Sequence, residues 1–188
     1  MSNYHALPAS GHHAAWSTWD HRAACTVKLR WENEAWTAET TLEQDNAVLV
    51  LRLSALWVVQ QVLLFRDMDE PDLWLGTDTH GRWGEINGAH RPDLDGCIDV
   101  DIAGSPFTNS IIIHRTPLHI GHTIDLPVMA IDVDTLGVVT HPHRYTRTGH
   151  DTWNYTSLVQ NTNVDVTVDE FGFVIDEPNA YRRITHNP

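Results

Sequence analysis

Asp99 and Asp101 form one pair of side chains whose types and spacing could do chemistry. On a β-strand, residues two apart project from the same face, roughly 7 Å from each other, near enough to share a cation or several sugar hydroxyls. The same carboxylates could instead pair with Arg115, Arg183 or loop amides in a structural network. We favour the structural network, because a hard cation requires about six or more oxygen ligands.

Residues 105–109, Ser-Pro-Phe-Thr-Asn, combine a fixed backbone angle, an aromatic ring and three side chains that bond readily to backbone. This combination is typical of a rigid turn, which is the structural interpretation. At the mouth of a cavity, the same loop would let Phe107 contact acyl chains while Thr108 and Asn109 meet a sugar. The sequence leaves both interpretations open.

Trp83 lies in a Gly-Arg-Trp-Gly segment, residues 81–84, and is the tryptophan that best fits a ring carried on a turn. Such a ring could contact a ligand, although it could equally well hold a hairpin together. Most of the other seven tryptophans are expected in the core.

The thirteen histidines do not produce a familiar zinc spacing, so the sequence predicts no metal site and no cofactor. His12 and His13 fall in an N-terminal segment that we expect to be mobile. No nucleophile elbow, phosphate loop or dinucleotide fingerprint is present, and catalysis is not expected. A Ser–His–Asp arrangement around Ser105 or Ser157 could still assemble in space, which keeps a hydrolase of lipid esters as an alternative.

Composition indicates one folded domain spanning residues 1–188, with residues 1–14 poorly ordered. The hydrophobic share of 41% and eight tryptophans provide for a sizeable core. A formal charge of -13 repels phosphate backbones and anionic membrane surfaces, and nucleic acid is therefore a poor candidate partner. The only cysteines, Cys25 and Cys97, are expected to be buried free thiols.

Neither export nor membrane insertion is indicated. The N-terminal residues lack the features of a signal peptide, so we expect a cytoplasmic protein. Residues 48–65 are apolar enough to resemble a membrane span, but Arg52 near their middle argues against insertion, and no transmembrane segment is predicted.

Alternating apolar residues predict strands over 25–31 and 36–42, joined by a polar turn at 32–34. Residues 169–172, Asp-Glu-Phe-Gly, read as the loop of a second hairpin. Further strands are predicted at 73–77, 98–102, 110–115, 122–133, 138–147, 152–158, 164–168 and 173–176.

Residues 48–65 are apolar at both alternating sets of positions, which suggests two strands with a break at Ser54 and cover on both faces. No convincing amphipathic helix supplies that cover. We therefore expect an all-β fold with little helix, a single curved antiparallel sheet forming a roll or incompletely closed barrel around a cavity. Alternatively, the second apolar face could be a homodimer interface in a purely structural module.

Two stretches of sequence carry a family resemblance. Residues 94–101, Leu-Asp-Gly-Cys-Ile-Asp-Val-Asp, are followed closely by the Ser-Pro-Phe-Thr-Asn segment. Residues 168–176, Val-Asp-Glu-Phe-Gly-Phe-Val-Ile-Asp, are followed by Pro178 and by Tyr-Arg-Arg-Ile at 181–184, with Tyr145 and Tyr155 upstream. With these features the chain resembles the Putative glycolipid-binding family of bacterial proteins.

The resemblance implies a mainly antiparallel roll, related in shape to bacterial lipoprotein carriers, whose cavity holds a glycolipid or similar amphiphile. Tyr145, Tyr155 and Arg183 join the candidate binding residues on this basis. The chain departs from the family pattern at residues 112–115, Ile-Ile-His-Arg, where a Pro-Ile-Arg-Arg-like run is common, and at Glu177, where an aromatic is common. The first departure removes a basic group and argues against a phosphate or sulfate headgroup.

Overall fold

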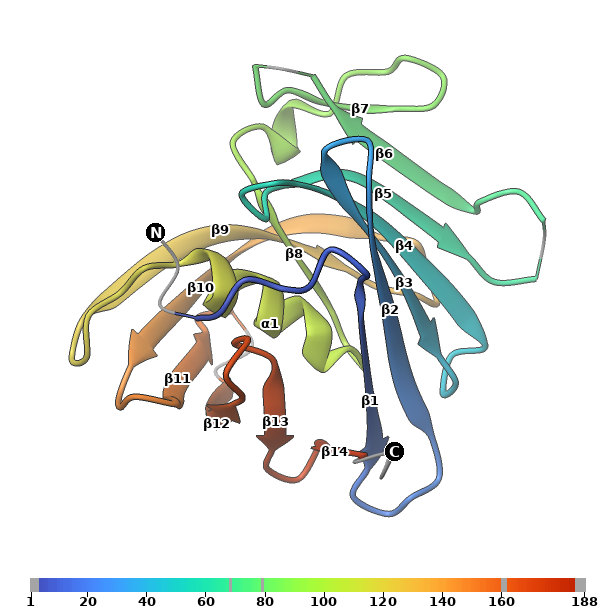
Figure 1. Ribbon diagram of the computed structural model, residues 1–188. Helices are drawn as coiled ribbons and strands as arrows, with labels where there is room; N and C mark the ends of the chain where they lie inside the picture. The colour runs from blue at the N-terminus through green and yellow to red at the C-terminus, as the bar shows by residue number, and fades with distance from the viewer. Residues whose placement is uncertain (1–3, 68, 79, 160–161, 185–188) are drawn as a thin grey trace.

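A computed structural model describes residues 4–67, 69–78, 80–159 and 162–184. All its strands belong to one strongly curved sheet that does not close on itself, which confirms the expected all-β fold with little helix (Figure 1). The strands are β1 (His12–Thr18), β2 (Ala24–Glu32), β3 (Ala35–Leu42), β4 (Ala47–Ser54), β5 (Val59–Phe65), β6 (Leu73–Thr77), β7 (Trp83–Glu85), β8 (Asp99–Ile102), β9 (Thr123–Ile131), β10 (Val138–Arg147), β11 (Thr152–Ser157), β12 (Thr162–Val168), β13 (Val174–Glu177) and β14 (Tyr181–Arg183).

The sheet consists of two runs of neighbouring strands that meet where β1 pairs with β14. Its order in space is β7-β6-β5-β4-β3-β2-β1-β14-β13-β12-β11-β10-β9-β8. Strands β7 and β8 therefore form the two edges, while the first and last strands lie side by side in the middle.

Both predicted hairpin turns are confirmed. Between β2 and β3, Asn33 and Glu34 have φ of 50° and 58°, the left-handed pair that a two-residue hairpin turn requires. Between β12 and β13, the Asp169 carboxylate accepts hydrogen bonds from the backbone of Phe171 and Phe173, and Gly172 has φ of 80°.

The apolar segment 48–65 forms β4 and β5, with a turn after Ser54 as predicted. The Ser54 hydroxyl accepts hydrogen bonds from the backbone N–H groups of Leu56 and Val58. The expectation that both faces are covered is wrong. Leu49, Leu51 and Leu53 are fully buried, whereas Val48 and Val50 on the other face are only half-buried.

The prediction of a strand at 110–115 is also wrong, because these residues belong to helix α1 (Pro106–Arg115). Pro106 occupies the first turn, where its missing N–H costs no helical hydrogen bond. The β-branched run at Ile111–Ile113 favours a strand locally, but in the helix it buries three side chains completely. Helix α1 lies inside the curve of the sheet (Figure 1).

Helix α1 fills the space that we expected the sheet to leave open. Phe107 and Ile111 pack into an apolar cluster that draws mainly on β1 to β8, while Ile112 and Ile113 pack into a second cluster that draws on β9 to β13. The inner face is therefore shielded by a helix, and two cavities border this helix in place of one empty interior.

The helix also accounts for one departure from an all-antiparallel sheet. It connects β8 to β9, and these two strands pair in parallel, with Asp99 opposite Val128. Parallel neighbours need a crossover connection, which is usually a helix. No helix in the described residues is long and apolar enough to cross a membrane.

Part of the N-terminal segment contacts the rest of the sheet. Residues 12–14 begin β1, and the Tyr4 hydroxyl accepts a 2.6 Å hydrogen bond from Trp153. Residues 1–3 lie outside the described part of the chain. Strands β1, β7 and β14 were not predicted, whereas the other late strands match the predicted segments to within a few residues.

Candidate functional site

Three of the ten predicted site residues, Asp101, Asn109 and Tyr155, line one cavity of about 650 Å³. They come from β8, α1 and β11, and Glu177 of β13 joins them. We call this the acidic cavity, because its lining holds five carboxylates and, among the described residues, no Lys or Arg. The carboxylates belong to Asp45, Asp101, Asp132, Asp134 and Glu177.

Glu177 and Asp101 are the carboxylates whose surroundings most favour the protonated form. Burial raises the pKa of Glu177 from its ordinary 4.5 to about 7, and the negative charge of Asp101 contributes to that rise. Burial likewise raises the pKa of Asp101, against the opposing effect of His143. Near neutral pH Glu177 is therefore partly protonated, and its carboxyl group can donate a hydrogen bond as well as accept one.

Asp101 connects the helix to the sheet beside the cavity. Its carboxylate accepts a 3.3 Å hydrogen bond from Thr108 and lies 3.9 Å from Nε2 of His143. His143 is only 1% exposed, and its Nδ1 atom has no hydrogen-bond partner among the described residues. Burial lowers the pKa of His143 although Asp101 acts in the opposite direction, so the ring is disposed to be neutral.

The buried tyrosines hold the helix side of the cavity in place. Tyr145 donates a 2.6 Å hydrogen bond to the Asn109 side chain, which leaves the amide group of Asn109 at the cavity wall. The Tyr145 and Tyr155 rings stack with centroids 5.5 Å apart. The acidic cavity is therefore backed by side chains in fixed positions.

An apolar wall stands next to these polar groups. It is formed by side chains of β8, β9, β10 and β12 and of the segment after β9, and Val139, which is 50% exposed, marks its solvent side. The apolar side chains concerned are Ile102, Ile131, Val133, Val139 and Val164. The acidic cavity can therefore accommodate a molecule that is polar at one end and apolar at the other.

Asp99 and Arg115 form the structural ion pair that the sequence left open. Asp99 has no exposed side-chain surface, and the guanidinium of Arg115 contacts both of its oxygens, at 3.2 and 2.5 Å. The two-apart spacing does place Asp99 and Asp101 on the same face, but their partners differ. Arg115 also borders a separate cavity of about 600 Å³ beside Trp36 and Trp57.

The remaining predicted residues lie in the core or in structural contacts. Phe107 is fully buried and packs 5.8 Å from the Phe173 ring. Trp83 is in β7, where its indole N–H donates to the carbonyl of Cys97. Arg183 donates to the Val174 carbonyl and to Asp169, and its guanidinium lies over the ring of Trp16.

The serines considered for hydrolysis are buried. Ser157 lies opposite His143 in the register of β10 and β11, but it is 0% exposed. The Ser105 hydroxyl lies 4.0 Å from the sulfur of Cys25. An ester cannot reach the Ser157 hydroxyl without a rearrangement of the core, whereas Ser105 is 5% exposed and lines the acidic cavity. Among the described residues, no group of three His, Cys, Asp or Glu side chains could hold a metal ion.

The family model described as Putative glycolipid-binding matches residues 13–183. The chain belongs to this family. A crystal structure of a DUF1089 family protein from Pseudomonas aeruginosa is similar, with 25% identity, a TM-score of 0.68, and coverage of 95% of this chain and 94% of that one. No curated protein matches the chain significantly.

Membership of the glycolipid-binding family confirms the resemblance read from residues 94–109 and 168–184. Sequence reasoning noticed Glu177 only as a departure from the family pattern and did not place it at the site. His143 was considered only as a metal ligand together with His141, and it was set aside because no partner pair stands at a familiar zinc spacing. Both residues can be recognised as neighbours of Asp101 only once the fold is known, because the sheet brings β8, β10 and β13 together around α1.

Proposed function

We propose that this protein binds an amphiphile in the acidic cavity and that the polar end of the ligand is uncharged or positively charged. The observation that carries the proposal is the lining of this cavity, with five carboxylates, Tyr155 and Asn109 beside an apolar wall and no Lys or Arg in its described part. A volume of about 650 Å³ lies within the range of small-molecule sites.

The carboxyl groups suit a hydroxyl-rich headgroup. Ionised carboxylates accept hydrogen bonds from hydroxyls, and a protonated carboxyl such as that of Glu177 near pH 7 can also donate one. A phosphate, sulfate or uronate would instead meet like charges in a partly dry site, where repulsion is only weakly screened. A sugar without acidic groups fits this chemistry, in agreement with the family description.

The apolar wall would hold the alkyl part of the ligand. Burying a methylene gains about 0.8 kcal/mol, so an octyl chain gains about 6 kcal/mol before the cost of immobilising the ligand. Together with hydrogen bonds from the headgroup, this gain would support a micromolar dissociation constant, which corresponds to a binding free energy of roughly 8 kcal/mol.

Calorimetric titration with three octyl glucosides tests the proposal, because the ligands differ only in whether the last sugar carbon carries an amine, a hydroxyl or a carboxylate. At about pH 8, where most of Glu177 is ionised, we expect the amine to bind about tenfold more tightly than the hydroxyl compound, and the carboxylate to bind more weakly still. Glu177→Gln should reduce the preference for the amine, whereas Glu70→Gln at an exposed loop should not. Preferred binding of the carboxylate compound, or no binding of any of the three, would refute the proposal.

Esterase activity remains the alternative enzymatic function, favoured only by the position of Ser157 across from His143. Because Ser157 is buried, we expect no hydrolysis of p-nitrophenyl octanoate above the background rate. Turnover that disappears in Ser157→Ala, with the fold preserved, would establish the alternative instead.

We also keep a homodimer and a cytoplasmic location as predictions. The outer face of β4 and β5 presents the half-buried apolar side chains Val48, Val50, Leu63 and Phe65, paired across the two strands. A dimer through this face would appear in sedimentation velocity as a concentration-dependent species that Val50→Lys removes.

A further inference from the structure

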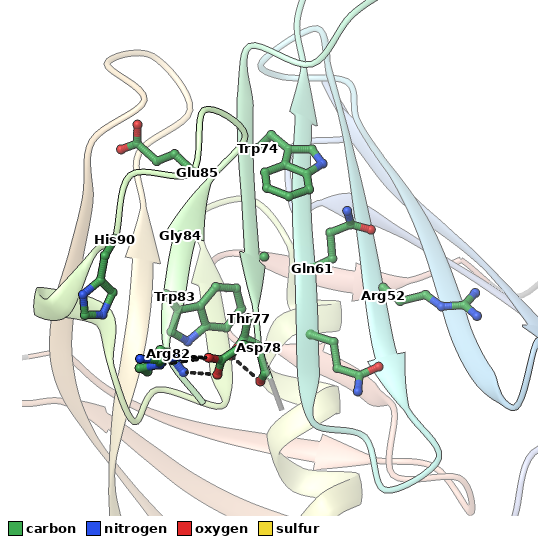
Figure 2. Close-up of a pocket in the computed structure, with 13 residues that line it drawn as sticks. Arg52, Gln61, Trp74, Thr77, Asp78, Arg82, Trp83, Gly84, Glu85 and His90 are labelled. Carbon is green, nitrogen blue, oxygen red and sulfur yellow. Dashed lines mark hydrogen bonds and ion pairs between the residues drawn. The ribbon is translucent and has the colours of Figure 1, made fainter. Parts of the chain in front are cut away.

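A shallow groove of about 750 Å³ lies on the outer face of β4 to β7, away from α1 (Figure 2). Its floor follows one row of paired residues across neighbouring strands: Arg52 and Gln61, Gln61 and Gly76, Gly76 and Gly84. The alternate residues Leu51, Val62 and Leu75 are fully buried on the inner face. The groove and the acidic cavity are therefore on opposite faces of the sheet.

The groove contains a flat aromatic surface. Trp74 leans over Gly76, and a methyl group at Gly76 would lie 3.2 Å from the Cη2 atom of the Trp74 ring. Gly76 thus lets the ring lie close to the backbone of β6, with Gln61 beside it on β5 (Figure 2). Trp74 is half-buried, so part of its ring surface is left for solvent or a ligand.

The hydrogen-bonding groups that remain available around this ring are neutral. The amide groups of Gln60 and Gln61 and the indole N–H of Trp74 make no hydrogen bond to any described residue, and all three residues line the groove. Amides offer both donors and acceptors, and the indole N–H offers a donor.

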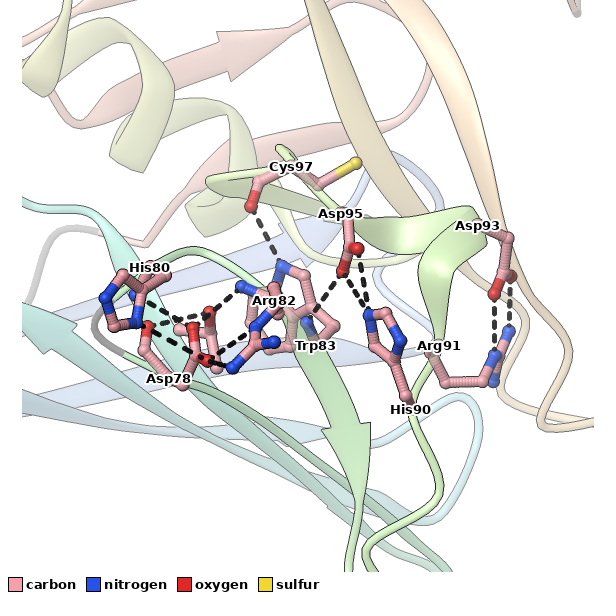
Figure 3. A network of polar contacts seen from close by, with 10 residues as sticks. Asp78, His80, Arg82, Trp83, His90, Arg91, Asp93, Asp95 and Cys97 are labelled. Atoms are coloured by element: carbon pink, nitrogen blue, oxygen red, sulfur yellow. Dashed lines mark hydrogen bonds and ion pairs between the residues drawn. The ribbon is translucent and has the colours of Figure 1, made fainter.

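The ionisable side chains of the groove, in contrast, already have ionic or hydrogen-bonding partners. Asp78 accepts a 2.8 Å hydrogen bond from Arg82, and Nε2 of His90 lies 2.9 Å from Asp95 (Figure 3). Arg52 is paired with Glu32.

Glu85, the remaining charged residue of the groove lining, lies 3.3 Å from the guanidinium of Arg91. A charged ligand would have to compete with these pairs, whereas a neutral one would meet the unpaired amides and the aromatic ring. The groove therefore favours an uncharged, hydroxyl-bearing ligand.

We propose that this outer groove is a second binding site, for a neutral saccharide that lies on the Trp74 ring and hydrogen-bonds to Gln60 and Gln61. The C–H faces of a pyranose are apolar enough to pack on an indole, and its hydroxyls match amide donors and acceptors. The site is separate from the acidic cavity and requires no lipid chain. The protein would then contact sugars on both faces of its sheet.

Two-dimensional amide NMR with neutral hexasaccharides tests this proposal directly. The probes are maltohexaose, cellohexaose and mannohexaose, with hexagalacturonate and a chitosan hexamer as the anionic and cationic counterparts. We expect at least one neutral hexamer to shift the indole signal of Trp74, identified by its loss in Trp74→Phe, together with the side-chain signals of Gln60 and Gln61. The two charged hexamers should shift these signals less.

Variants separate the groove from the rest of the protein. Trp74→Ala should weaken binding about tenfold, which corresponds to about 1.4 kcal/mol. Trp31→Ala removes an exposed tryptophan outside the groove, on β2, and should leave binding unchanged. Gln61→Ala provides a second test at a half-buried polar side chain, in case Trp74→Ala perturbs the fold.

The outcomes also distinguish this site from the acidic cavity. Binding that survives both Trp74→Ala and Gln61→Ala, or signal changes confined to the surroundings of Glu177, would overturn the proposal. The same holds if no neutral hexamer binds at millimolar concentration. Glu177→Gln should not alter saccharide binding in the groove. Failure of the wild-type protein to bind any octyl glucoside in the acidic cavity would refute only the proposed function.

Discussion

Replacing Glu177 by Gln should stabilise this protein at neutral and alkaline pH and have little effect under acidic conditions. In the folded protein, burial and the nearby Asp101 raise the pKa of Glu177 from 4.5 to about 7. Gln has a similar shape and remains neutral, so the variant removes the cost of ionising this carboxyl in its partly dry surroundings.

The direction of this change in stability follows from when the folded and unfolded chains bind the Glu177 proton. At a pH below about 4.5 the folded and unfolded chains both hold the proton, and Glu177 has no differential effect. As the pH rises from there to about 7, the unfolded chain releases the proton first, so the wild-type protein loses stability. Above about pH 8 the loss is complete and constant.

The magnitude has an upper bound set by the two pKa values. At about 1.4 kcal/mol per pH unit, the change from 4.5 to about 7 corresponds to at most about 3.5 kcal/mol. Because Glu177 is only partly buried, solvent screening reduces the expected gain to about 1–2 kcal/mol. For a chain of this size that gain raises Tm by about 2–8 °C.

Thermal unfolding of the wild type, Glu177→Gln and the control Glu70→Gln between about pH 4.5 and pH 8.5 provides the assay. The difference in Tm between Glu177→Gln and the wild type should grow with pH and then level off, while the control stays close to the wild type throughout. A difference that is independent of pH, or a variant less stable than the wild type at pH 8, would show that the carboxyl is not held in an unfavourable environment.

Three further predictions concern the core. Arg115→Met should lower the free energy of unfolding, measured with urea, by about 3 kcal/mol, because it leaves the Asp99 carboxylate buried without a partner. Adding Asp99→Asn should recover part of this loss. A single variant as stable as the wild type would contradict the pairing. Phe107→Ala should cost about 3–5 kcal/mol by the same measurement, and a cost below about 1 kcal/mol would mean that α1 is not packed as described. Burial raises the pKa of Cys25 to about 12, so an aromatic disulfide reagent should label it only after unfolding, and rapid labelling of the folded protein would contradict its burial.

The parts of the fold that could be predicted from sequence are those determined by local pattern. Alternation in residues 25–31 and a polar pair at the turn are sufficient to define the β2–β3 hairpin. Helix α1 was missed because Ile111–Ile113 favour a strand locally, and only the packing of Phe107 and the isoleucines against both halves of the sheet stabilises the helix.

For the candidate site, too, the sequence could predict the local geometry but not the contacts between distant elements. The two-apart spacing correctly put Asp99 and Asp101 on one face, yet it could not show that Arg115 pairs with Asp99 while Asp101 faces the acidic cavity. That difference depends on the direction of α1, which no local pattern specifies. Glu177 reaches the same cavity from β13, a strand separated from β8 by more than seventy residues.

The pairing of β1 with β14 also affects how the molecule is made. Strand β14 is translated after every other strand, yet it lies in the middle of the sheet, where Trp16 is opposite Arg183. Until it emerges from the ribosome, both β1 and β13 have an unpaired edge that can capture another nascent chain. Breaking the chain between β7 and β8 and linking the two ends would move the new termini to the outer edges. In such a circular permutant β14 and β1 are made one after the other, so neither central strand has to wait for the end of synthesis.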